Sequence, residues 1–99
     1  MAIVEISVTP LGIGQMGVSE YVAGCVKLAR ESGLKCQLTP MGTIIEGAAG
    51  ELFPLLQKMH ESPFAAGAER VSTLIKIDDR RDRSHSMQGK VDSVIGKLE

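Results

Sequence analysis

The sequence has very few aromatic residues and cysteines, and each shortage excludes a class of protein. Of its 99 residues none is tryptophan, one is tyrosine and two are phenylalanine. Base-stacking platforms for nucleic acids and aromatic cages for cations are therefore not expected. The two cysteines, Cys25 and Cys36, are too few for a disulfide scaffold and too far apart for a zinc knuckle. A reducing, cytoplasmic location fits this composition best.

The chain also has no excess of positive charge and no long apolar run. Eleven Lys and Arg residues stand against twelve Asp and Glu residues, which gives a formal net charge of -1. A nucleic-acid partner held by bulk charge is therefore not expected. No apolar stretch approaches the ~20 residues that a membrane span requires, and the segment 1–10 contains Glu5 and lacks the basic start of a signal peptide. We expect one domain covering residues 1–99.

Periodicity predicts four strands and three helices in the order β-α-β-β-α-β-α. The opening residues alternate, with Val4, Ile6 and Val8 on one side, which is typical of a strand. The strands are expected at 2–9, 34–39, 43–46 and 69–78. The first two helices are expected at 18–32 and 48–61, the second one ending at Ser62–Pro63. Each has one apolar stripe expected in the core, with Val18, Tyr21, Val22, Cys25, Val26 and Ala29 in the first and Ala49, Leu52, Phe53, Leu56 and Met59 in the second. The last helix carries one apolar stripe of Met87, Val91, Val94, Ile95 and Leu98.

This order indicates an α+β fold, a ferredoxin-like βαββαβ sandwich with an extra C-terminal helix and a four-stranded antiparallel sheet. Helices then cover one sheet face, and the first and third strands are central. The uncovered face mixes apolar, hydroxyl and charged groups, and its expected members are Ile3, Glu5, Ser7, Thr9, Gln37, Thr39, Ser72, Leu74 and Lys76. Such a mixture favours a sheet-to-sheet contact between two copies that encloses a polar pocket.

Glu5 has two interpretations in this arrangement. It lies in the middle of a central strand, where it could be a half-exposed carboxylate opposite Lys76 that contributes little to stability. It could equally be a carboxylate buried between two copies that recognises a cation or an amidine-like edge of a ligand.

Several segments together resemble the YkoF-like thiamine-binding family. The most specific is LTPMGTIIEG at 38–47, followed by IKIDDRRD at 75–82, the loop PLGIG at 10–14 and SEYVA at 19–23. The resemblance covers nearly the whole chain. It implies the ferredoxin-like fold, homo-oligomers (dimers, or tetramers built as dimers of dimers) formed through the sheets, and non-catalytic binding of thiamine or its hydroxymethylpyrimidine part, with no further cofactor.

The stretch that carries the resemblance supplies one group of candidate ligand-binding residues, and the expected geometry supplies a second. The first group is Thr39, Met41, Gly42, Thr43 and Glu46; the second is Glu5, Ser7, Ile13 and Ser19. Glu46 or Glu5 would offer a carboxylate, the Ser and Thr residues hydroxyls, and Met41 and Ile13 an apolar wall, while Gly42 would let a backbone amide approach closely. Residues 39–42 could also serve turn geometry alone, and Glu46 could be a solvated strand-end carboxylate.

The charged run that begins with Asp78, Asp79, Arg80 and Arg81 is expected to extend the last strand beyond the domain body. We interpret it as an oligomer interface, an intersubunit salt-bridge network. A solvated surface is the ordinary alternative, and the arginines could instead hold the phosphate of a phosphorylated thiamine.

No motif in the sequence indicates catalysis or a bound metal. His60 and His85 lack partners at metal-ligand spacing, and no nucleophile is paired with a base. Two other functions stay open. One is a small dimeric α+β enzyme with Glu5 or Glu46 as general base, and the other is a ligand-sensing regulatory module.

Overall fold

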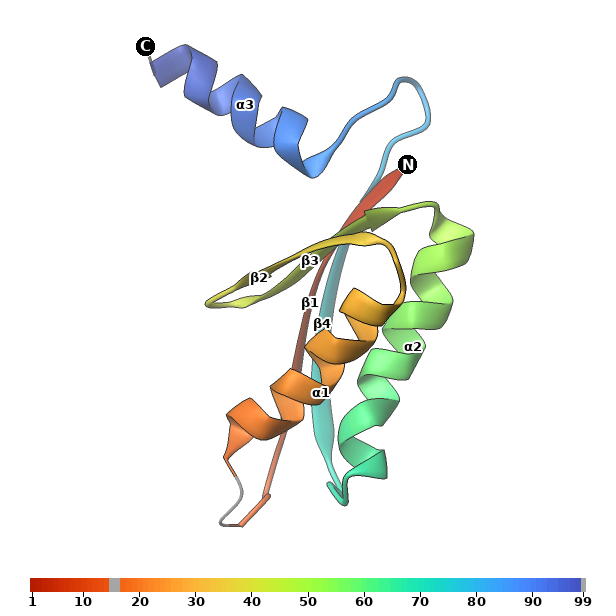
Figure 1. Cartoon of the computed structure of the whole chain (residues 1–99), viewed down its shortest axis with the longest axis vertical. Coiled ribbons are helices and arrows are strands. Elements are labelled where there is room, and N and C mark those ends of the chain that lie inside the picture. Colours follow the sequence, from red (N-terminus) through yellow and green to blue (C-terminus); the bar gives the residue numbers. More distant parts are fainter. Residues whose placement is uncertain (15–16, 99) are drawn as a thin grey trace.

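The computed structural model describes residues 1–14 and 17–98, and it confirms the ferredoxin-like α+β architecture (Figure 1). The four strands form one antiparallel sheet in the order β2-β3-β1-β4, so that β1 and β3 are central. The elements are β1 (Ala2–Pro10), α1 (Val18–Glu31), β2 (Lys35–Thr39), β3 (Gly42–Gly47), α2 (Ala49–Ala65), β4 (Val71–Asp79) and α3 (Met87–Leu98).

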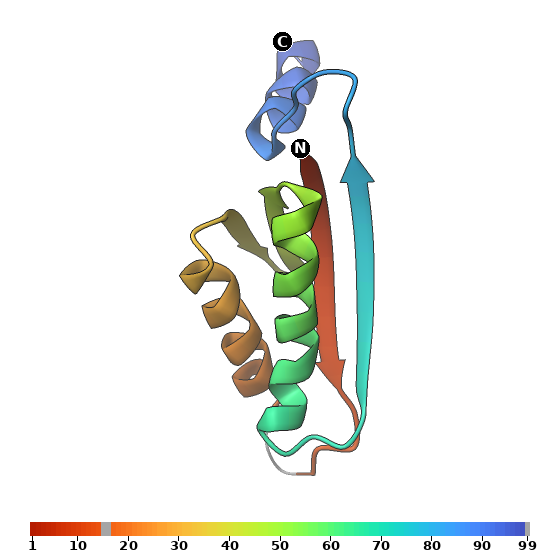
Figure 2. The same cartoon turned by 90° about the vertical axis from the view of Figure 1, so that its right-hand side faces the viewer.

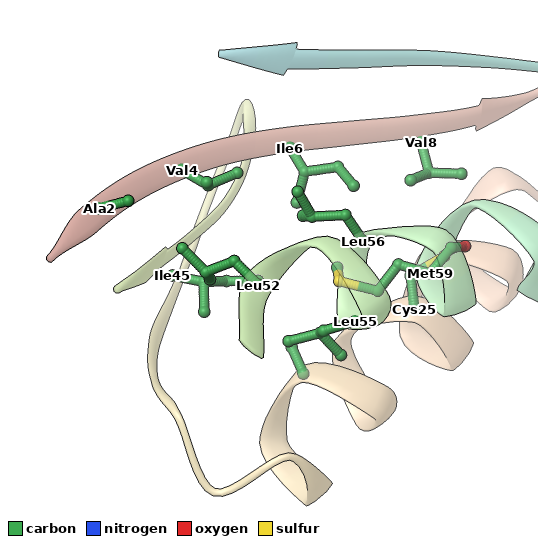
Figure 3. Packing of buried hydrophobic residues seen from close by; sticks show 11 residues of the cluster. Ala2, Val4, Ile6, Val8, Cys25, Ile45, Leu52, Leu55, Leu56 and Met59 are labelled. Carbon is green, nitrogen blue, oxygen red and sulfur yellow. The ribbon is translucent and has the colours of Figure 1, made fainter. Parts of the chain in front are cut away.

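Helices α1 and α2 lie side by side on one face of the sheet, and the core fills the space between them and the strands (Figures 1 and 2). The alternation in β1 sends Val4, Ile6 and Val8 to this face, where all three are buried. From the opposite side α2 contributes Leu52 and Met59, which are 0% and 1% exposed (Figure 3). The burial of these apolar side chains between the helices and the strands stabilises the two-layer arrangement.

Helix α2 is longer than the sequence predicts, and its buried face is slightly rotated. It continues to Ala65 and includes Pro63, which was expected to end it. Pro63 lies in the last turn and has no N–H for the carbonyl of Met59, four residues earlier. That carbonyl instead accepts a hydrogen bond from the Cys25 thiol at 3.2 Å, which ties α2 to α1. Phe53, expected on the buried stripe, is 56% exposed.

Helix α3 stands away from the other two helices at the end of the sheet where β1 begins (Figures 1 and 2). None of its residues is buried, and its apolar stripe is open to solvent. The charged run, expected to extend the last strand beyond the domain body, does so only from Arg80 onward. Asp78 and Asp79 are the last residues of β4 and pair with Ile3 and Ala2 of β1, because the β1–β4 ladder runs the full length of both strands.

None of the described helices is long and apolar enough to cross a lipid bilayer. The longest of them, α2, has charged and polar residues distributed along its exposed side.

Candidate functional site

The sheet surface opposite α1 and α2, called here the bare face, is ordered by the strand register. One row across the four strands reads Gln37, Ile44, Glu5 and Lys76. The next row towards the start of β1 reads Lys35, Glu46, Ile3 and Asp78. The sequence-based assignment of this face is right for β1 and β4, since cross-strand partners share a face. It missed Ile44 and Glu46, although their alternation with buried Thr43 and Ile45 was a readable signal.

Glu5 is exposed on this face in the isolated chain. Its cross-strand neighbours are Lys76 on β4 and Ile44 on β3. The register therefore places Glu5 opposite Lys76, as the interpretation of Glu5 as a half-exposed carboxylate requires. Among the described residues, however, no basic nitrogen lies within 4.0 Å of either carboxylate oxygen of Glu5. The carboxylate is thus available to a group that approaches the bare face.

A notch opens beside the second half of β1, because the hairpin formed by β2 and β3 ends before β1 does. The β1–β3 ladder ends at the pair Ile6–Thr43, whereas the β1–β4 ladder continues to Pro10–Val71. The backbone of residues 7–9 therefore has no ladder partner on its hairpin side. A cavity of 210 Å³ fills this gap, which we call the hairpin notch.

The hairpin notch contains five of the predicted ligand-binding residues. They are Ser7, Thr39, Met41, Gly42 and Thr43. The helices close its inner side with side chains that the sequence analysis assigned only to the core, namely Val22, Cys25 and Met59. Burial raises the pKa of the Cys25 thiol, so the thiol stays protonated at neutral pH and is a donor rather than a nucleophile.

Turn chemistry and close approach explain two of the notch residues. The Thr39 hydroxyl donates to the Gly42 carbonyl at 2.9 Å and accepts from the Met41 amide at 3.2 Å, which closes the hairpin turn. A Cβ on Gly42 would lie 2.8 Å from the carbonyl oxygen of Ile6, so only glycine lets the hairpin start this near β1. Thr43 is 4% exposed and faces the helices, while Met41 at the turn is 80% exposed.

Two predicted residues lie outside the lining of the notch. Ser19 lines a second, more apolar hollow of 540 Å³ between α1 and the hairpin, and the two hollows share Val22 and Leu38. Ile13 lies half-buried in the described part of the connection from β1 to α1. Neither Glu5 nor Glu46 lines the notch.

Glu46 is engaged elsewhere, at the start of α3. Its Oε2 accepts a hydrogen bond of 2.7 Å from the Met87 amide, and Lys90 of the same helix donates to Asp78 Oδ2 at 2.5 Å. Glu46 and Asp78 flank Ile3 in one row of the bare face. These two contacts hold the first turn of α3 at the end of the bare face where β1 begins.

The rest of the charged run pairs within the chain. Arg81 binds Asp79 at 2.7 Å, and Arg80 binds both carboxylate oxygens of Asp82 at 2.6 and 2.9 Å. The Arg80 hydrogen bonds lower the pKa of Asp82 to about 2. All four groups are on the surface of the isolated chain, where such pairs contribute little to stability.

Within residues 1–14 and 17–98 no three His, Cys, Asp or Glu side chains are grouped so that they could hold a metal ion. His60 donates to, or accepts from, the Thr73 hydroxyl at 2.7 Å and stacks edge-on against Phe64. His85 lies at the far end of the sheet beside Met1. What the site offers is hydrogen-bonding groups beside apolar walls, which suits recognition of a small polar molecule.

Comparison with known proteins finds relatives of similar length and a solved structure with the same fold. The chain is 44% identical over 98 residues to the UPF0045 protein YqgV of Bacillus subtilis, a match that covers 95% of this chain and 94% of YqgV. It is 45% identical over 98 residues to a UPF0045 protein of Staphylococcus xylosus, covering 95% and 92% of the two chains. The crystal structure of hypothetical protein MJ1052 from Methanocaldococcus jannaschii superposes with a TM-score of 0.83 at 30% identity, covering 94% of each chain.

The resemblance seen in the hairpin and strand segments is confirmed at the level of the family. The model of the family described as "Thiamine-binding protein" matches residues 4–95, which include the hairpin notch and all of the two bare-face rows except Ile3. The chain belongs to this thiamine-binding protein family.

Proposed function

We propose that this protein binds thiamine or a related hydroxymethylpyrimidine-type molecule, without chemistry, in a pocket that two subunits form together. The observation that carries the proposal is the hairpin notch, where an unpaired strand edge lies beside apolar side chains in a chain of the thiamine-binding family. Residues 1–99 act as one binding domain in the cytoplasm. The partners are the small-molecule ligand and further copies of the chain, with neither a nucleic acid nor a membrane.

The chemistry of the notch suits an aminopyrimidine. Such a ring presents donors and acceptors along one edge, and those backbone groups of residues 7–9 that point away from β4 and have no β3 partner offer the complementary groups. The hydroxyls of Ser7 and Thr43 add further partners, and Met41 and Val22 add apolar contact. Glu5, two residues before Ser7 on the bare face, supplies a carboxylate for the cationic thiazolium.

The size of the notch supports a pocket shared between copies. Its 210 Å³ is less than the ~300–1,000 Å³ of typical small-molecule sites. The surface around it is apolar enough for a contact, since Leu74 of the bare face is 71% exposed. The stripe of α3 adds Val91, Val94, Ile95 and Leu98, which are 48–79% exposed on a helix anchored to the same face. Two bare faces brought together would cover these groups, and two such dimers would form the homotetramer.

Calorimetric titration of the oligomer with thiamine, its pyrimidine fragment and thiamine phosphate tests the ligand. We expect thiamine to bind and Thr43→Val to weaken binding about tenfold, because a buried ligand hydrogen bond contributes roughly 1.4 kcal/mol. Thr73→Val is the matched control, since Thr73 lies on the same side of the sheet but bonds to His60 and should leave affinity unchanged. Absence of binding by all three ligands at millimolar concentration would refute the proposal.

Glu5→Gln and Glu46→Gln separate the two candidate carboxylates. We expect Glu5→Gln to weaken thiamine binding, because it removes the charge that faces the thiazolium. Glu46→Gln should have a smaller effect, since Glu46 holds the Met87 amide. The reverse order would move the carboxylate of the site to Glu46.

The charged run is proposed to contribute to subunit contacts. Arg80 and Arg81 pair with aspartates of their own chain and can share them with a second copy. The double variant Arg80→Ala, Arg81→Ala should shift the tetramer towards dimers on a sizing column. An unchanged elution volume would remove this part of the proposal.

A further inference from the structure

A third hollow lies at the other end of the sheet from the hairpin notch, beside the start of α3, and its lining is basic rather than apolar. Its volume is 660 Å³, and it lies between residues 80–86 and the first two turns of the helix. The side chains that define its charge are basic or hydroxylic, and they are Arg80, Arg83, His85, Lys90, Ser84 and Ser93. Among the described residues, none that line it carries a carboxylate.

Three of these side chains, two arginines and one lysine, are positively charged at neutral pH. Two of them pair with carboxylates, and among the described residues the third does not. Arg80 pairs with Asp82, and Lys90 pairs with Asp78. Arg83 lies within 4.0 Å of no carboxylate in residues 1–14 and 17–98. Arginine presents several donors in a planar fork that matches the oxygens of a phosphate. The hollow thus has one uncompensated guanidinium beside two further cations.

The walls are fixed by bonds to the start of the chain. The imidazole of His85 donates from Nε2 to the Met1 carbonyl at 2.8 Å, and the Arg80 amide donates to the same carbonyl at 3.3 Å. The helix end itself is not the binding element. Its Met87 amide is bonded to Glu46, and its Gly89 amide to the Ser86 hydroxyl at 2.9 Å. An anion here would be held by side chains, with the residual helix dipole adding to the attraction.

We propose that this hollow binds a phosphate group, either as free phosphate or as the monoester of a small organic molecule. Arg83 is its principal ligand, and Lys90, Ser84 and Ser93 complete the set. A volume of 660 Å³ leaves room for an organic part beside the phosphate. The site is separate from the hairpin notch, since Arg80 follows the last residue of β4 whereas the notch adjoins the end of β1 that pairs with the first residues of β4. The proposal therefore does not depend on thiamine binding.

Titration of the ¹⁵N-labelled full chain with inorganic phosphate at constant ionic strength tests the site. We expect amide shifts confined to residues 80–93 and saturation in the millimolar range or below. Arg83→Ala should weaken binding about tenfold, the loss expected for one charge-assisted hydrogen bond. Arg70→Ala is the matched control, because Arg70 is an exposed arginine at the opposite end of β4. Equal weakening by both variants, or no saturable shift, would overturn the proposal.

Glycerol 3-phosphate in a parallel titration distinguishes the two sources of the phosphate. Tighter binding of the ester than of phosphate identifies a phosphorylated metabolite as the ligand, and the reverse identifies free phosphate. Titration of Arg83→Ala with unphosphorylated thiamine should give the wild-type affinity, which keeps this site distinct from the notch. If thiamine binds neither protein, the phosphate titration still decides the proposal by itself.

Discussion

The two faces of the sheet differ in how completely one chain can satisfy them. On the covered face Val4, Ile45 and Leu52 are 0% exposed. On the bare face Leu74 is 71% exposed beside Glu5 and Lys76. The covered face is closed over β1 and β3, although Ile75 and Ile77 of β4 on the same face stay 43% and 39% exposed. The bare face and the stripe of α3 leave more apolar surface in water. The comparison shows that the buried core lies on one side of the sheet, and it leaves the other side for the association proposed above.

The largest expected effect comes from the covered face. Leu52→Ala should lower the free energy of unfolding by about 2–5 kcal/mol, because it leaves a cavity beside Ile45 in a close-packed core. The adjacent Phe53→Ala should cost less than about 1 kcal/mol, since Phe53 is 56% exposed. Denaturant unfolding followed by circular dichroism measures both. A similar loss in the two variants would contradict the one-sided core.

The second effect concerns association through the bare face. Leu74→Glu would place a carboxylate in the proposed sheet-to-sheet contact, where burying an unpaired charge is costly. We expect sedimentation velocity to show dissociation of the oligomer while the circular dichroism spectrum of the folded chain is retained. Phe53→Glu is the matched control, because it changes an exposed apolar residue on the helical layer. Dissociation by the control alone would place the contact on the helical side.

The third effect lies at the hairpin notch, where both faces meet. Gly42→Ala should destabilise the protein by about 1–3 kcal/mol, because the added Cβ meets the Ile6 carbonyl and must push the hairpin away from β1. Gly50→Ala has open space around its Cβ in α2 and should instead stabilise the protein by about 0.5–1 kcal/mol. Thermal unfolding compares the two variants. Loss of thiamine binding in Gly42→Ala alone would link the notch geometry to function.

The sequence predicts the covered face better than the site, and the reason is physical. The spacing of apolar residues along the chain shows which side of each element avoids water. The positions of β1, the hairpin and the helices, and the burial of residues such as Val4 and Leu52, could therefore be predicted. The early stop of the β1–β3 ladder depends on the register of the hairpin against β1, and the side-chain pattern of either strand alone does not encode that register. The role of Glu46 at Met87 joins residues 41 positions apart and could not be foreseen. The extension of α2 through Pro63 required a partner for the Met59 carbonyl on another helix.

The smallest effect is the pH dependence of the α3 anchor. The hydrogen bond and charge of Lys90 hold the pKa of Asp78 below its usual range. The contribution of this pair is therefore present above the ordinary carboxyl pKa of about 3.9 and is lost as the pH falls through the lowered value. Because both groups are exposed, global stability should hardly change. We expect hydrogen exchange in α3, corrected for intrinsic rates, to become faster relative to α2 when the pH falls from 6 to about 3. Asp78→Asn should remove that difference, because its side chain does not titrate, and an unchanged pH dependence in this variant would show that Asp78 does not control the anchor.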